Sequence, residues 1–141
     1  MQFDGTNYES LTEGQSFSTV EFSITKSMNM DFQSCFSFSF SDDESANTGQ
    51  EEDRNEFVNP VLIANFSVMK EALAWPTGVL HARELMCVYE GVACDEPLLM
   101  KMRVKNKLIK KDRKFLVLEL QAYKRQSGIM ALEVERTLVW P

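Results

Sequence analysis

Several features that mark particular classes of protein are scarce or missing in this sequence. No stretch approaches the roughly 18 consecutive apolar residues of a membrane-spanning helix, so we expect no transmembrane segment and no membrane partner. The first residues, Met1 to Asp4, have neither the basic nor the apolar region of a secretory signal peptide. Cysteine occurs three times, at Cys35, Cys87 and Cys94, without the spacing of metal ligands. An odd number of such cysteines favours reduced thiols and a cytoplasmic protein.

Residues that carry common catalytic and cofactor chemistry are equally scarce. His81 is the single histidine in 141 residues. The sequence contains no G-x-S-x-G nucleophile motif and no glycine-rich phosphate loop, which argues against an α/β-hydrolase and a P-loop enzyme. His81 and Glu84 lie three residues apart on an expected strand, where their side chains would point to opposite faces, so they make a poor metal pair. We therefore expect no metal and no cofactor.

Charge is distributed unevenly along the chain, although the net charge is only −6. Residues 42–56 carry seven acids and one base, with few apolar side chains, and this composition predicts a flexible acidic surface loop. Residues 101–114 carry eight bases and one acid. Most of these bases alternate with apolar residues, which is typical of the solvated face of a strand. No aromatic residues are interleaved with them, so we expect no nucleic-acid partner.

The first half of the chain predicts a strand and a short helix. Apolar residues between Phe17 and Ile24 follow an imperfect period of two, which indicates a strand. Thr25 is a good N-cap for a following helix. The apolar stripe of that helix has the spacing i, i+4, i+7 and i+8 and consists of Met28, Phe32, Cys35 and Phe36. The next residues, 37–40, either extend this helix or turn into a strand.

A second helix is predicted from about Pro60 to Ala74. Asn59 is a suitable N-cap and Pro60 suits the first helical position. The segment is apolar on nearly all sides, which is typical of a buried helix. Pro76 and Gly78 are expected to end it.

Four antiparallel strands are predicted to follow, at about 79–89, from Met100, from Leu116 and from Met130 to Trp140. On the second of them Lys101, Arg103, Lys105 and Lys107 are expected on the solvated face. One apolar helix followed by a long meander predicts a curved sheet wrapped around the helix. We therefore expect an α+β protein, a single hotdog domain over residues 1–141 with the acidic loop at about 42–56.

Several stretches resemble the MaoC-like dehydratase family, in particular the N-terminal-type hotdog domains of hydroxyacyl-thioester dehydratases. Residues 8–17, Tyr-Glu-Ser-Leu-Thr-Glu-Gly-Gln-Ser-Phe, are similar to the opening of that family. Residues 22–25, Phe-Ser-Ile-Thr, resemble the segment that leads into its short helix. Residues 78–85 resemble the strand after its central helix, and residues 92–98 its V-x-x-G-D-x-L turn. The resemblance spans nearly the whole chain.

The resemblance implies addition or removal of water across the α,β double bond of an acyl-CoA or acyl-carrier-protein thioester. Such enzymes use an Asp and a His after the short helix, in a segment like G-D-x-N-P-x-H, at a dimer interface. The two side chains move the protons of one water, while a helix N-terminus polarises the thioester carbonyl. Here the corresponding segment, residues 40–47, reads Phe-Ser-Asp-Asp-Glu-Ser-Ala-Asn. It offers Asp42 and Asp43 but no histidine.

Three hypotheses follow for this chain. The first is a non-catalytic or degenerate dehydratase-like subunit, which the missing histidine favours. The second is an active (R)-specific hydratase or dehydratase with a rearranged site built from His81 and Asp42 or Asp43, although a structural or interface role is the more common one for such a histidine. The third is an acyl-CoA thioesterase that uses Glu56 or Glu71. In each case the partners are an acyl thioester and a second hotdog subunit, in a homodimer or a heterodimer.

Overall fold

The computed structural model describes residues 6–35, 57–66 and 73–141 of the chain. The described elements, in chain order, are η1 (Tyr8–Ser10), β1 (Val20–Phe22), α1 (Lys26–Ser34), α3 (Pro60–Asn65), β2 (Leu80–Val88), β3 (Leu98–Lys110), β4 (Arg113–Lys124) and β5 (Met130–Trp140). The four long strands lie where the sequence predicts them. The first predicted strand is shorter than expected, since only Val20–Phe22 forms β1 and Ser16 adds an isolated bridge to Arg103. Residues 37–40 and the predicted acidic loop, residues 42–56, lie outside the described residues.

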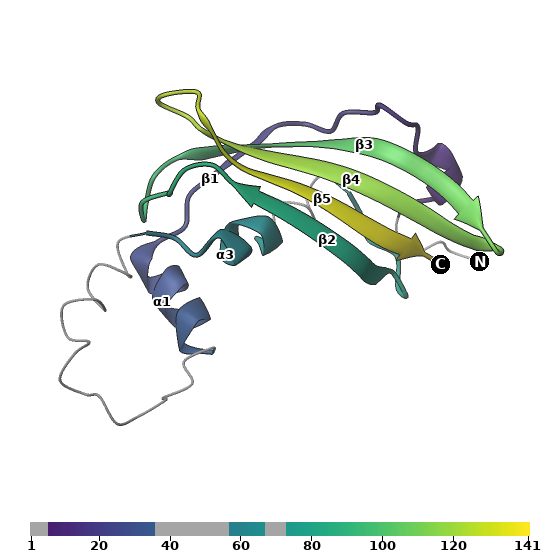
Figure 1. The fold of residues 1–141 in the computed structure, drawn as a ribbon, viewed down its shortest axis with the longest axis horizontal. Helices are drawn as coiled ribbons and strands as arrows, with labels where there is room; N and C mark the ends of the chain where they lie inside the picture. The colour runs from purple at the N-terminus through teal and green to yellow at the C-terminus, as the bar shows by residue number, and fades with distance from the viewer. Residues whose placement is uncertain (1–5, 36–56, 67–72) are drawn as a thin grey trace.

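The strands form one antiparallel sheet in the order β1-β3-β4-β5-β2, and it curves over α3 (Figure 1). One face of the sheet carries most of the core, with side chains less than 3 % exposed at Leu98, Val104, Leu116, Leu118, Leu120, Leu132, Val134 and Leu138. Ile63 and Ala64 of α3 belong to the same buried cluster. The predicted α+β architecture, a curved sheet wrapped around a helix, is therefore confirmed.

The short helix α1 begins where the sequence predicts, because the Thr25 hydroxyl accepts a hydrogen bond from the Met28 amide at 3.1 Å. Its buried face differs from the predicted apolar stripe. The side chain of Asn29 is fully buried, whereas Met28 is only half-buried and Cys35 is exposed. Because a polar residue, Asn29, lies at the centre of the packed face, the spacing of apolar residues predicted the wrong face of α1 as buried.

The second helix starts as predicted and ends early. The Asn59 side chain caps it by accepting from the Val61 amide at 3.0 Å, and Pro60 occupies the first turn. Phe66 then has extended backbone angles, φ −61° and ψ 141°, so the helix stops at Asn65. The prediction of one continuous helix from Pro60 to Ala74 is wrong, since Leu73 and Ala74 are not helical either. Residues 67–72 lie outside the described part.

A β-bulge in β3 overturns the prediction for Lys107. Val104 pairs with Leu118 and Asn106 with Val117, so Lys105 is an extra residue that shifts the alternation of side chains. Lys107 therefore faces the same side as the buried Leu116, its direct partner. Its ammonium donates to the carbonyl oxygens of Tyr8 and Leu11 at 2.8 and 2.6 Å. Lys107 is a partner of buried backbone groups and not a member of a solvated face.

No helix within the described residues is long and apolar enough to cross a membrane.

Candidate functional site

The single histidine lies beside a carboxylate, on the edge strand β2. The ladder between β2 and β5 shifts its register between His81 and Arg83, so Ala82 is an extra residue. This bulge brings the side chains of His81 and Glu84 to the same side, with 2.9 Å between Nε2 and Oε2. The prediction that they point to opposite faces is wrong because it assumed an unbroken strand.

Glu84 joins His81 to a buried arginine. The Nε atom of Arg136 on β5 donates to the same Glu84 oxygen at 2.8 Å, and the Arg136 side chain is only 6 % exposed. A terminal nitrogen of Arg136 also donates to the Ala64 carbonyl oxygen at 2.9 Å and to Asn65 Oδ1 at 3.3 Å. The guanidinium therefore caps the C-terminus of α3, where a cation is stabilised by the exposed carbonyl groups. We refer to His81, Glu84 and Arg136 as the β2–β5 polar cluster.

The β2–β5 polar cluster can orient an imidazole. A carboxylate accepts hydrogen bonds, so in neutral His81 the Nε2 atom carries the hydrogen and Nδ1 keeps its lone pair. The His81 side chain is 46 % exposed, so this ring remains open to solvent or to a ligand. Chemically, the arrangement provides a base whose orientation is set by a carboxylate that is itself fixed by an arginine.

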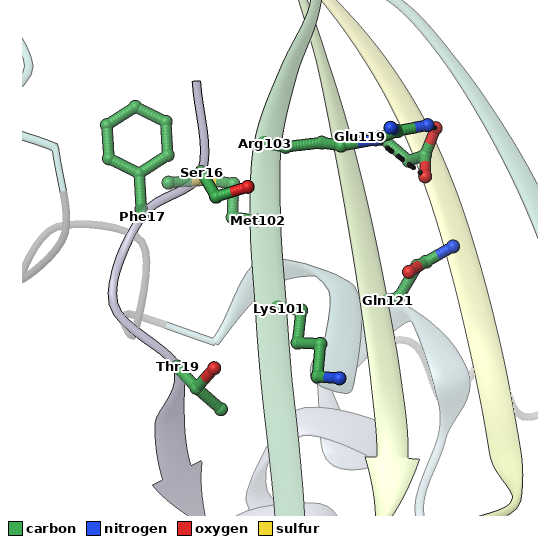
Figure 2. A pocket seen from close by; sticks show the side chains of 8 residues that line it. All are labelled: Ser16, Phe17, Thr19, Lys101, Met102, Arg103, Glu119 and Gln121. Carbon is green, nitrogen blue, oxygen red and sulfur yellow. Dashed lines mark hydrogen bonds and ion pairs between the residues drawn. The ribbon is translucent and has the colours of Figure 1, made fainter. Parts of the chain in front are cut away.

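A second feature lies on the opposite face of the sheet, where a groove of about 370 Å³ opens between the N-terminal segment and β3. Figure 2 shows its lining side chains, which come from the segment before β1 and from β3 and β4: Ser16, Phe17, Thr19, Lys101, Met102, Arg103, Glu119 and Gln121. Arg103 and Glu119 form a two-point ion pair there, at 3.1 and 3.0 Å. The remaining polar groups of the groove are hydroxyls, an amide and the Lys101 ammonium.

The remaining candidates from the sequence are not placed. Asp42, Asp43, Glu56 and Glu71 lie outside the described residues. Within the described ranges, no group of three or more His, Cys, Asp or Glu side chains is arranged to hold a metal ion. Glu84 and Arg136 were missed as members of a site, because neither residue type nor spacing shows that a bulge and a cross-strand pair bring them to His81.

Comparison with known proteins identifies the fold. No protein-family model matches the sequence, and neither does any curated protein sequence. Among solved structures, a MaoC-like dehydratase from Rhodospirillum rubrum matches with a TM-score of 0.66 and 14% identity, over 99% of this chain and 97% of that one. An R-hydratase from Pseudomonas aeruginosa matches with a TM-score of 0.66 and 16% identity, over 95% and 84%. The HadBC complex from Mycobacterium tuberculosis, a 3R-hydroxyacyl-ACP dehydratase, matches with a TM-score of 0.64 and 10% identity, over 99% and 98%.

These structures are hotdog proteins, so the predicted hotdog fold is confirmed. The resemblance to MaoC-like dehydratases holds at the level of the fold. An activity has to be argued from the site, because one fold supports many functions.

Proposed function

We propose that this chain is an acyl-thioester-binding hotdog subunit that lacks a complete acid–base pair of its own. The observation that carries the proposal is the position of the single histidine. His81 belongs to β2, and the sequence between α1 and α3 contains none. The hotdog hydratases and dehydratases to which the chain is similar support the substrate class, an acyl-CoA or acyl-carrier-protein thioester.

A hydration of an enoyl thioester needs a base for the attacking water and an acid for the α-carbon. Carboxylates such as Asp42 and Asp43 have ordinary pKa values near 4, so one of them alone is a weak acid–base catalyst at neutral pH. A homologous hotdog subunit that retains both Asp and His would supply the missing group across a dimer interface. The HadBC and ChsH1–ChsH2 complexes of Mycobacterium tuberculosis, both similar to this chain, pair two different subunits, and they support such an assembly.

The experiment that tests this proposal uses crotonyl-CoA with the purified chain alone and with a homologous hotdog subunit that retains Asp and His. One assay follows the loss of the enoyl absorbance and the release of free CoA. We expect little hydration by the chain alone and an increase above the partner's own rate in the mixture. Release of free CoA by the chain alone would instead indicate a thioesterase, for which Glu56→Gln and Glu71→Gln are the diagnostic variants.

The β2–β5 polar cluster favours a second candidate function, an active hydratase or dehydratase in which His81 is the base. Its supporting observation is the 2.9 Å contact between His81 Nε2 and Glu84 Oε2, which orients the imidazole. In that case His81→Ala abolishes hydration, and Glu84→Gln lowers kcat while the KM for crotonyl-CoA changes little. If hydration by the wild type is robust and both variants retain it, His81 is not the base.

A further inference from the structure

The groove on the outer face of the sheet arises from an irregular pairing between β3 and the segment before β1. Ser16 pairs with Arg103 and Val20 with Met100, so three residues of the segment oppose only two residues of β3. The extra residue makes the segment bow away from β3, as a β-bulge does, and such bulges often turn side chains toward a ligand. Ser16, Phe17 and Thr19 thereby form one wall of the groove, and Lys101 lies on the other (Figure 2).

Between residues 101 and 105 the outer face of β3 carries three cations, and two of them are neutralised by carboxylates on neighbouring strands. Arg103 pairs with Glu119 at 3.0 Å, and Lys105 pairs with Glu135. Lys101 differs, because its direct partner on β4 is the neutral Gln121. The amide of Gln121 in turn donates to Glu133 at 2.8 Å. Within the described residues, Lys101 has no ion pair, and its ammonium lies 4.8 Å from the centre of the Tyr123 ring.

The groups around Lys101 suit an anion. In the described part of the chain, the hydroxyls of Ser16 and Thr19 make no hydrogen bond with protein atoms, so both are available as donors. The single acid of the lining, Glu119, is already held at both oxygens by Arg103. The charges of the lining therefore sum to one uncompensated positive charge, beside two hydroxyl donors.

We propose that this groove binds the phosphate group of a phosphate ester, with Lys101, Ser16 and Thr19 as its donors. A nucleotide and a phosphopantetheine group both have this chemistry. The site lies on the face of the sheet opposite to α3 and the β2–β5 polar cluster, so it does not depend on the proposed thioester function.

The test is an NMR titration of the full chain with three probes: inorganic phosphate, AMP and 4′-phosphopantetheine. We expect amide shifts at Ser16, Thr19 and Lys101 with at least one phosphate ester, and weaker binding at high salt because the contact is electrostatic. Lys101→Gln should weaken that binding by about tenfold or more, since it removes a charged hydrogen-bond donor. Lys101→Arg should restore most of it.

Lys110→Gln is the matched control, because Lys110 is an exposed lysine on the same strand, has no ion pair among the described residues and is not part of the groove. It should bind like the wild type. Preference for AMP identifies a nucleotide as the ligand, and preference for 4′-phosphopantetheine identifies an acyl-carrier group. The proposal is overturned if no probe shifts the groove amides, or if Lys101→Gln binds as tightly as Lys110→Gln.

Discussion

Asn29 is a buried polar residue that ties α1 to the segment preceding α3. Its Nδ2 atom donates to the Phe57 carbonyl oxygen at 2.9 Å, and its Oδ1 atom accepts from the Asn59 amide at 2.9 Å. The side chain therefore provides hydrogen-bond partners for two backbone groups just before α3, as a neighbouring strand would.

We predict that Asn29→Ala lowers the free energy of unfolding by roughly 2–3 kcal/mol, because it leaves two backbone groups without partners. The measurement is urea denaturation followed by circular dichroism. Asn106→Ala serves as the control, since Asn106 is exposed and its substitution should change the unfolding midpoint very little. Equal midpoints for the two variants would contradict the role given to Asn29.

The three thiols differ in environment, and this difference sets their reactivity. Cys35 and Cys87 are exposed, whereas Cys94 is half-buried near Asn29. Burial, together with the negative charge of Asp95, raises the pKa of the Cys94 thiol above its usual value. A raised pKa leaves less thiolate at neutral pH, and the thiolate is the reactive form.

We therefore predict that iodoacetamide modifies Cys94 severalfold more slowly than Cys35 or Cys87 at pH 7.5. Mass spectrometry of the three variants that each keep one cysteine gives the rates. Raising the pH should speed the reaction of Cys94 over a higher range than that of the exposed thiols. A Cys94 rate equal to that of Cys87 would show that burial does not protect it.

The bulges mark the limit of prediction at the level of single elements. An alternating pattern predicted the start of β3 to within two residues and both bounds of β5, because each strand buries one face. An inserted residue reverses the pattern from that point on, and Ala82 and Lys105 carry no side-chain feature that distinguishes them. For that reason the sequence predicted the strands correctly but misplaced Lys107 and separated His81 from Glu84.

For the helices, the starts could be predicted from the sequence, whereas the end of α3 could not. The starts of α1 and α3 were predictable, since Thr25 and Asn59 have side chains that cap the first turn. The end of α3 at Asn65 was not, because the apolar residues that follow suit a continuing helix equally well. The capping group at that end is Arg136, which is 71 residues further along the chain.

Arg136 is predicted to be the residue that holds α3 to β5. Arg136→Ala should cost roughly 3–5 kcal/mol of stability, because it removes the cap and leaves Glu84 with the His81 contact alone. Thermal and urea denaturation measure the loss. Arg113→Ala is the control, since Arg113 is exposed and has no ion pair in the part that the structure describes. An Arg136→Ala protein as stable as Arg113→Ala would exclude this role.

On the scale of the whole molecule, β2 is an edge strand of the sheet that the described residues form. Among the residues that the structure describes, β2 pairs with β5 along one side only, and it exposes Leu80, Leu85 and Val88, which are 64%, 47% and 51% accessible. An unpaired edge with apolar side chains favours association with another sheet. We expect this edge to join a second hotdog subunit, either a copy of the chain or a homologue.

Light scattering at micromolar concentration should give about twice the 16.2 kDa of one chain, or the mass of a heterodimer when the homologue is added. Leu85→Lys should shift the protein toward monomer, because a lysine on an edge strand opposes sheet extension. Ile109→Lys places the same charge on β3, at a side chain that is 66% exposed, and should leave the mass unchanged. A wild-type chain that stays monomeric, alone and with its homologue, would contradict the assembly.

The function rests on a different kind of inference from the fold. The hotdog architecture was predicted from the order of helices and strands, which involves nearly the whole chain. The candidate site depends on contacts between residues far apart in sequence, such as Glu84 and Arg136. The proposed loss of activity depends on the lack of a histidine in one segment. The absence of a histidine between α1 and α3 was readable from the sequence, whereas the carboxylate beside His81 was not.

The most direct test of the central claim is the steady-state rate at which the wild-type chain alone hydrates crotonyl-CoA. The loss of one acid–base group lowers such a rate by about 10²- to 10⁴-fold, so we predict a rate that far below a hydratase that keeps both Asp and His. The same measurement on His81→Ala should give the same low value. A robust rate that His81→Ala abolishes would identify the β2–β5 polar cluster as the catalytic site. A robust rate that His81→Ala leaves unchanged would contradict the claim that the chain lacks a complete acid–base pair.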